Sequence, residues 1–205
     1  MKNRIAAFAV TTLISAAPLA QAASSTDLTV TGSITPAACT PTFANGGMID
    51  LGKISAKDLK PTQVTLIGRP TTQMIVTCDA PTTFALQATD NRPNTTVSGY
   101  FGVGLTPAGE KLGHYIPTIT NVLADGQAAA SIESPDQGAT WGATNSVRPN
   151  RYLSVSATAD TNTPIAAKDV SMDMEIPTWI LRSDGLTLNE EITIDGSATL
   201  EMKYL

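Results

Sequence analysis

The strongest constraint on the fold is an alternation of apolar and polar residues at both ends of the chain. Near the start, every second residue is apolar or glycine, at Leu28, Val30, Gly32 and Ile34, with threonines and a serine between them. Near the end, the same period runs over residues 192–204. A period of two is that of a β-strand with one buried face. Both ends are therefore predicted to be strands.

Residues 1–22 have the composition of a secretory signal peptide. Lys2 and Arg4 form a basic start, residues 5–19 are mostly apolar, and Ala20-Gln21-Ala22 is a small-x-small cleavage site. The alternative of a membrane anchor is weaker, because two threonines, a serine and a proline interrupt an apolar run that is short for a spanning helix. We therefore expect an exported protein without membrane insertion, whose mature chain begins near Ala23.

The charge of the mature chain excludes some classes of partner. Removal of Lys2 and Arg4 leaves 13 − 2 = 11 basic residues against 18 acidic ones, a net charge of −7. An acidic surface disfavours nucleic acid and anionic membranes. The remaining 205 − 22 = 183 residues are enough for one domain with a proper core.

Short alternating segments with turn signals between them predict an all-β fold. Clear strands are expected over 72–78, 84–88, 153–159 and 170–176, with a hairpin turn at Asp125-Gly126. Residues 48–52 could form an edge strand, and 100–105 another strand. Residues 111–123 have a partly helical spacing of apolar residues, but Gly113 and Pro117 favour strand and loop. Residues 131–150 read as a long irregular loop, and Asp195-Gly196 as a turn or a bulge. About eight to ten short strands predict a β-sandwich.

Cys39 and Cys78 are the only cysteines. Both remain after signal removal and enter an oxidising compartment, so we expect a disulfide between them. A structural zinc site is a poor alternative, because His114 is the only histidine and the ligands are too few.

The sequence offers little for catalysis, so we expect a protein that is not an enzyme and binds no metal or cofactor. No nucleophile or orienting acid lies near His114. Glu190 and Glu191 are adjacent, so on a strand they point to opposite faces. Asp173 and Glu175 share a strand face and could help to hold calcium, although a solvated face is the commoner role of such pairs. Three aromatic residues could instead stack on a sugar: Tyr100, Tyr115 and Trp141.

Several features together resemble the pilin subunits of bacterial chaperone/usher fimbriae. They are the signal peptide, the alternating segment with a central Gly32, Ala37-Ala38-Cys39 directly after it, Cys78 about 40 residues further on, and a last strand with a penultimate Tyr204. The resemblance covers both ends of the chain and the cysteine loop. Residues 50–54 and 77–80 look like the local signatures of a less characterised fimbrial-type branch.

This resemblance implies an immunoglobulin-like β-sandwich that lacks its final strand and is completed by a donated one. Residues 23–38 would be the N-terminal donor-strand extension, and residues 39–205 the pilin-like domain. The donor side chains would be Leu28, Val30, Gly32 and Ile34, with Gly32 small enough to pass a tight point. The strand that lines the groove and pairs first with a chaperone would contain Ala198, Leu200, Met202 and Tyr204.

The function implied is that of a structural subunit of a surface fimbria, assembled by donor-strand exchange. Its partners would be a periplasmic chaperone, an outer-membrane usher and neighbouring subunits, and it would pass through the periplasm to the cell surface. Two alternatives stay open: an adhesive module that binds host or carbohydrate ligands, and a secreted sandwich that packs its first strand into its own core. The second alternative predicts a stable monomer.

Overall fold

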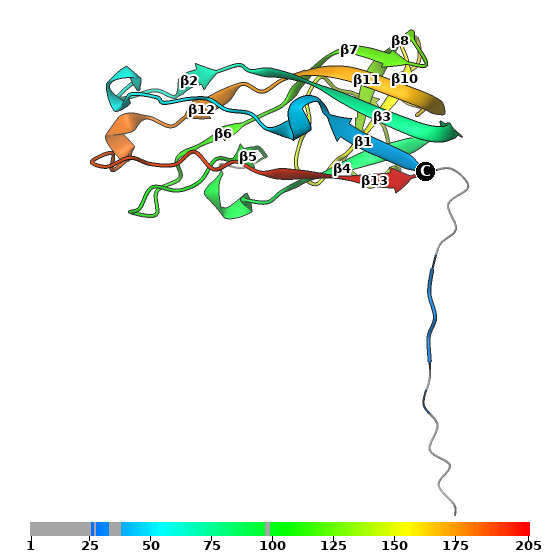
Figure 1. Ribbon diagram of the computed structural model, residues 1–205, viewed down its shortest axis with the longest axis horizontal. Coiled ribbons are helices and arrows are strands. Elements are labelled where there is room, and N and C mark those ends of the chain that lie inside the picture. The colour runs from blue at the N-terminus through cyan, green and yellow to red at the C-terminus, as the bar shows by residue number, and fades with distance from the viewer. Residues whose placement is uncertain (1–25, 27, 33–37, 97–98) are drawn as a thin grey trace, which may run out of the picture. The chain divides into compact units, whose positions relative to one another are not determined.

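The computed structural model describes residues 26, 28–32, 38–96 and 99–205 (Figure 1). The chain divides into two compact units, Met1–Ile34 and Thr35–Leu205. In the first unit, the described residues belong to no strand, and Leu28 and Val30 are 89% and 87% exposed. The predicted signal peptide and Ile34 lie outside the described residues.

The second unit is built from strands, which confirms the all-β prediction. A nine-stranded sheet contains β1 (Cys39–Phe43), β3 (Thr71–Thr82), β4 (Phe84–Asp90), β7 (Thr118–Ala124), β8 (Gln127–Ser134), β9 (Gly142–Ala143), β10 (Tyr152–Ala157), β11 (Ala167–Glu175) and β13 (Ala198–Tyr204). A four-stranded sheet contains β2 (Thr65–Gly68), β5 (Phe101–Gly102), β6 (Gly113–Tyr115) and β12 (Thr178–Ile180). Four 3-10 turns complete the unit: η1 (Ala44–Gly47), η2 (Ala56–Asp58), η3 (Pro93–Thr95) and η4 (Ser183–Gly185). In the described part of the chain, no helix is long and apolar enough to cross a membrane.

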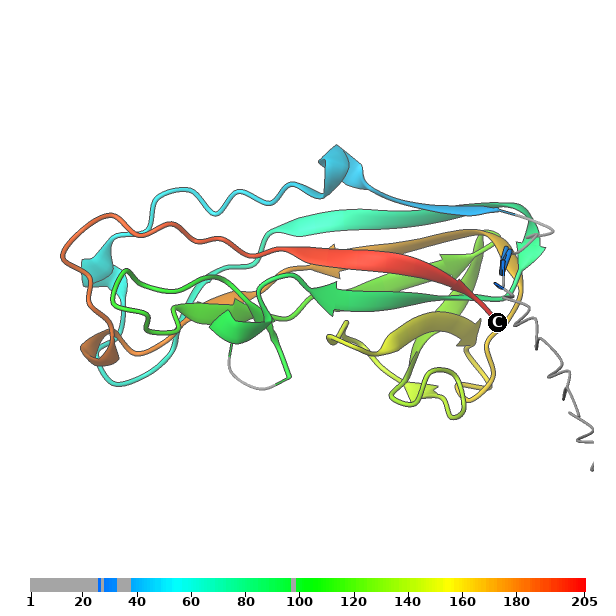
Figure 2. The same ribbon diagram turned by 90° about the horizontal axis from the view of Figure 1, so that it is seen from below.

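The large sheet curls until its first and last strands approach each other. Its strand order is β1-β3-β11-β7-β8-β10-β4-β13, with β9 paired to β8, and all the pairs are antiparallel. At one end the strands β1 and β13 meet, because the backbone N–H of Cys39 donates a hydrogen bond to the hydroxyl oxygen of Tyr204 at 3.0 Å. Away from this end, the segments that follow β1 and precede β13 run apart from each other (Figure 2). The sheet is therefore nearly closed at one end and open along the rest.

The core is formed by apolar residues that alternate with polar ones along the strands. Met74, Val76 and Cys78 on β3 are buried, and Val170 and Met172 on β11 are buried beside them. A main apolar cluster fills the curled sheet, and a smaller cluster of Val103, Leu112 and Ile180 lies under the four-stranded sheet. The side chain of Tyr115 packs against both clusters and so connects them.

The turn predictions are confirmed in part. Asp125 and Gly126 both have positive φ (49° and 76°) and join β7 to β8 directly, as a two-residue hairpin turn requires. Residues 111–123 form β6 and the greater part of β7, so the strand interpretation is right there. The long stretch 131–150 begins inside β8 and also contains the short β9.

Three local predictions are wrong. Residues 48–52 form no strand, because Gly52 has a φ of 65° and its N–H binds the Asp50 carboxylate at 2.8 Å. The strand expected over 100–105 is only two residues long, and Gly104 has a φ of 106°. Asp195 and Gly196 form neither a turn nor a bulge in a strand: they belong to an extended segment that leads into β13.

Candidate functional site

The surface of the domain has an apolar groove with a volume of about 790 Å³. One wall is the segment after β1, which includes Ile49, Leu51 and Ile54, and the other is the segment that leads into β13. Along this second wall the groove is lined by Leu188, Glu190, Glu191, Ile192, Thr193, Ile194, Gly196, Ser197, Ala198 and Leu200. The floor is made by residues of both core clusters, including Phe101, Val103, Leu112, Tyr115, Met174 and Ile180.

Both walls carry backbone groups that no strand uses. In the described part of the chain, β1 pairs only with β3, and β13 pairs only with β4. Within the same part, the backbone N–H groups of residues 188–194 donate no hydrogen bond, although Asp195 N–H binds the carbonyl oxygen of Val103 at 2.9 Å. Unpaired strand edges of this kind are templates for another strand. The groove therefore combines an apolar floor with two edges that can form backbone hydrogen bonds.

Two contacts join the walls of the groove. At the closed end, Cys39 N–H binds the Tyr204 hydroxyl. Toward the opposite end, the Lys53 ammonium lies 3.3 Å from the Glu191 carboxylate, and both side chains are more than 80% exposed. An exposed ion pair contributes little stability, about 0–1 kcal/mol.

The side chain of Tyr115 projects from the floor of the groove toward the second wall. Its ring stacks on Phe101 with 5.1 Å between the ring centroids. A Cβ atom added to Gly196 would lie 3.0 Å from Tyr115 Cε1, so the ring reaches the level of the wall's backbone. Burial raises the pKa of the Tyr115 hydroxyl, with a smaller contribution from the charge of Asp90, so this hydroxyl stays neutral.

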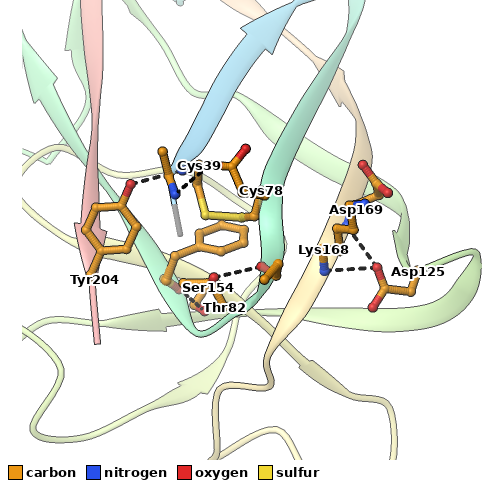
Figure 3. The surroundings of a disulfide bond; sticks show 12 residues. Cys39, Cys78, Thr82, Asp125, Ser154, Lys168, Asp169 and Tyr204 are labelled. Atoms are coloured by element: carbon orange, nitrogen blue, oxygen red, sulfur yellow. Dashed lines mark hydrogen bonds between the residues drawn. A yellow bond between two sulfur atoms is a disulfide. The ribbon is translucent and has the colours of Figure 1, made fainter. Parts of the chain in front are cut away.

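The predicted disulfide between Cys39 and Cys78 is present and joins opposing residues of β1 and β3 (Figure 3). Next to it, Ala38 N–H donates to the Asp79 carboxylate at 3.2 Å. The first residues of the domain are thus held by the covalent bond, this hydrogen bond and the bond to Tyr204. The disulfide is consistent with export into an oxidising compartment.

The four residues of the predicted groove strand lie at different places relative to the groove. Ala198 and Leu200 line the groove. Met202 packs against the main core, and Tyr204, 43% exposed, closes the end. The groove extends further toward the N-terminal side of this strand than those four residues indicate.

The sequence pattern does not indicate that Tyr115 is part of the groove floor. Its position on β6 carried no signal in the sequence beyond a short apolar pattern. Ile192 and Ile194 belong to the alternation over residues 192–204, and this alternation is the signal that indicates them as groove residues.

The other candidate chemical groups have structural partners. The imidazole of His114 stacks between Tyr100 and Trp179, at centroid distances of 4.7 and 5.3 Å, and burial lowers its pKa. Asp173 accepts hydrogen bonds from Gln73 and Asn121.

Glu175 pairs with Arg69 at 3.2 Å, so it and Asp173 each bind neighbouring side chains. Among the described residues, no group of three or more His, Cys, Asp or Glu side chains is arranged to hold a metal ion.

Residues 28–100 match the family described as "Protein of unknown function (DUF1120)", a range that includes the alternating N-terminal segment and both cysteines. Over 251 aligned residues the chain is 28% identical to Protein GltF of Escherichia coli K12, covering 100% of this chain and 98% of GltF. It is 25% identical over 224 residues to the uncharacterized protein YhcF of the same organism, covering 91% and 93% of the two chains. The chain is thus a distant relative of GltF and YhcF along nearly their whole lengths, and its first part matches the DUF1120 family.

Proposed function

We propose that this protein is a structural subunit of a surface fibre, in which the N-terminal segment of one subunit fills the groove of the next. The observation that carries the proposal is an apolar groove between the segments that follow β1 and precede β13, the two outermost strands of the large sheet, in a chain that also has an alternating, exposed segment ahead of its first strand. On this proposal the domain is an immunoglobulin-like sandwich of the pilin type that lacks one strand.

The groove offers enough free energy to hold such a strand. Three apolar side chains, Leu28, Val30 and Ile34, would each contribute about 1.5–3 kcal/mol on burial. Backbone hydrogen bonds to the two edges would add about 0.5–1.5 kcal/mol each. Until the groove is filled, its apolar floor and free edges make the single subunit prone to aggregation. A chaperone that covers the groove and an outer-membrane usher are therefore the partners that we propose, together with neighbouring subunits.

The location follows from the same proposal. The subunit would form its disulfide in the periplasm, where this bond is stable, and would then join a fimbrium on the cell surface. It would act without catalysis and without a cofactor.

An adhesive, sugar-binding role has less support. Each of the three aromatic residues that suggested it has a packing or hydrogen-bond partner within the domain. Tyr115 lies in the groove floor, the ring face of Tyr100 stacks on His114, and the indole N–H of Trp141 binds the Gly138 carbonyl oxygen at 3.1 Å.

The proposal is tested with the exported mature chain, a version that lacks residues 23–35, and a synthetic peptide of residues 25–36. We expect the shortened protein to aggregate or to melt at a lower temperature, and the peptide to restore a monomer with a higher melting temperature. A peptide in which Val30 is replaced by Asp is the matched control and should have no effect. If the shortened protein is a stable monomer that ignores the first peptide, strand donation is wrong and a secreted binding module takes its place.

A further inference from the structure

We propose that His114 is an acid-sensitive switch behind the floor of the groove: when its imidazole takes up a proton, the four-stranded sheet loosens and the groove loses part of its floor. The loosening of the sheet is independent of the proposed function, whereas its effect on the filling of the groove rests on that function.

The four-stranded sheet has two faces with different roles. On one face, Phe101, Tyr115 and Thr178 are paired across three strands and line the groove. On the other face, His114 is paired with Trp179 in the next row. Successive side chains of a strand point to opposite faces, so β6 carries His114 on the back of the floor and Tyr115 on its groove side. A change around His114 therefore acts on the strand that holds Tyr115.

The imidazole of His114 is the middle ring of an aromatic stack. Its centroid lies 4.7 Å from that of Tyr100 and 5.3 Å from that of Trp179, with interplanar angles of 19° and 20°. The Nδ1 atom is buried and has no hydrogen-bond partner among the described residues. A neutral imidazole carries hydrogen on one ring nitrogen only, but the protonated ring donates from both. Protonation would therefore leave a buried N–H group on a charged ring without an acceptor.

The surroundings of His114 do not compensate for this charge. Residues of the four strands other than His114 are all uncharged, and the titratable side chains next to it are the phenols of Tyr100 and Tyr115. On the segment that packs against β5, Asp90 accepts two backbone N–H groups at 2.8 and 3.0 Å, and Arg92 is held in an ion pair of 2.7 Å. Stacked rings attract a cation, but a buried, unpartnered charge costs more than this attraction supplies.

The four-stranded sheet is short enough to respond. The strand β5 has two residues, and β6 and β12 have three each. Strands with so few ladder hydrogen bonds open locally more easily than long ones. Because β6 lies between β5 and β12, its displacement releases both neighbours.

The direction of the pH effect follows from burial. In an opened sheet the imidazole is hydrated and has its ordinary pKa of 6.5, whereas burial in the closed sheet lowers the pKa. The open form therefore binds protons more strongly. The closed sheet has its full stability above pH 6.5 and loses stability as the pH falls below this value.

NMR spectroscopy measures the titration in the full mature chain. His114 is the only histidine, so the imidazole signals in long-range ¹H–¹⁵N spectra need no assignment. From about pH 8 to about pH 5, we expect the folded protein to titrate with a midpoint below 6.5. Tyr100→Ala should move the midpoint up toward 6.5, because it gives water access to the ring. A midpoint at or above 6.5 in the unchanged protein overturns the switch.

Amide hydrogen exchange, corrected for the intrinsic effect of pH, measures the loosening. Exchange in β6 and β12 should become about tenfold faster for each pH unit below 6.5, down to the NMR midpoint, while β3 and β11 should not change. His114→Phe keeps an aromatic stack and cannot be protonated, so it should show no acceleration. An equal response in His114→Phe, or no response in the unchanged protein at about pH 5, overturns the switch.

Peptide binding separates the switch from the proposed function. The peptide of residues 25–36 should bind the shortened protein about tenfold more weakly at about pH 5.5 than at about pH 7.5, and equally at both when His114→Phe is added. If it binds at neither pH while β6 and β12 still loosen, the proposed function fails and the switch stands. Equal binding at both pH values despite loosened strands overturns the coupling of His114 to the groove floor.

Discussion

The hydroxyl of Tyr204 accepts a hydrogen bond from the backbone N–H of Cys39, 165 residues earlier in the chain, at 3.0 Å. This bond joins the two outermost strands of the large sheet, which otherwise have no neighbour on their outer sides in the described part of the chain. One side-chain hydroxyl thus closes the end of the groove, next to the disulfide (Figure 3).

Tyr204→Phe should lower the free energy of unfolding by about 0.5–1.5 kcal/mol, because it removes this hydrogen bond and keeps the ring. Urea denaturation followed by circular dichroism measures the change. Tyr152→Phe is the matched control, since the Tyr152 hydroxyl has no hydrogen-bond partner among the described residues. Equal losses in the two variants would mean that the bond to Cys39 contributes nothing specific.

Replacing both Cys39 and Cys78 by alanine should lower the free energy of unfolding by roughly 4 kcal/mol, the entropy of closing a loop of about this length. The two residues are 39 positions apart. Thermal unfolding of the variant, and of the unchanged protein with and without a reductant, measures the loss. Reduced protein that melts like the oxidised form would contradict the prediction.

Asp136 should make the protein sensitive to acid. Hydrogen bonds from the Thr140 hydroxyl (2.6 Å), the Ser134 hydroxyl (2.7 Å) and the Thr140 backbone N–H (2.8 Å) lower the pKa of its carboxyl group to about 2 from an ordinary 3.8. A carboxyl pKa that is lower in the folded state contributes stability above pH 3.8, and this contribution is lost as the pH falls from about 4 to about 2.

Asp136→Asn should therefore flatten the fall in stability between pH 4 and pH 2, measured as urea midpoints at successive pH values. Asp58→Asn is the control, because the Asp58 carboxylate accepts no hydrogen bond within the described ranges. If the urea midpoints of Asp136→Asn and of the unchanged protein fall equally between pH 4 and pH 2, the hydrogen bonds to Asp136 do not persist in solution.

Amide hydrogen exchange should show the groove walls directly. The backbone N–H groups of residues 188–194 have no acceptor in the described structure, so they should exchange rapidly in the shortened protein. Binding of the peptide of residues 25–36 should slow exchange in this segment, while β7 and β11 should be protected both with and without the peptide. If the peptide slows amide exchange only outside residues 188–194, it does not bind along this wall of the groove.

The sequence predicted the strands whose two faces differ in polarity. Met74, Val76 and Cys78 alternate with polar residues, and they are buried on β3 as expected. The Asp125-Gly126 turn was equally clear, because only a few residue types adopt positive φ at both turn positions. The disulfide followed from the cysteine count and the predicted export.

The groove could be predicted only in part. Alternation marked residues 192–204 as a strand with one apolar face, but it could not say where pairing with a neighbour stops. In the structure, pairing with β4 begins only at Ala198, and the residues before it form a wall instead. Tyr115 was not recognised as part of the floor, because its role depends on the absence of a side chain at Gly196, 81 residues away by number, and on contacts with two separate clusters. Such long-range packing has no local pattern in the sequence.

The position of the disulfide also determines how the domain responds to mechanical tension. A pull on the N-terminal segment enters the domain at Cys39, the first residue of β1, and the covalent bond to Cys78 passes the load to β3 at that same point. The strand β1 therefore cannot be peeled from its neighbour one hydrogen bond at a time. The load is carried instead by β3, which is hydrogen-bonded along most of its length to β11.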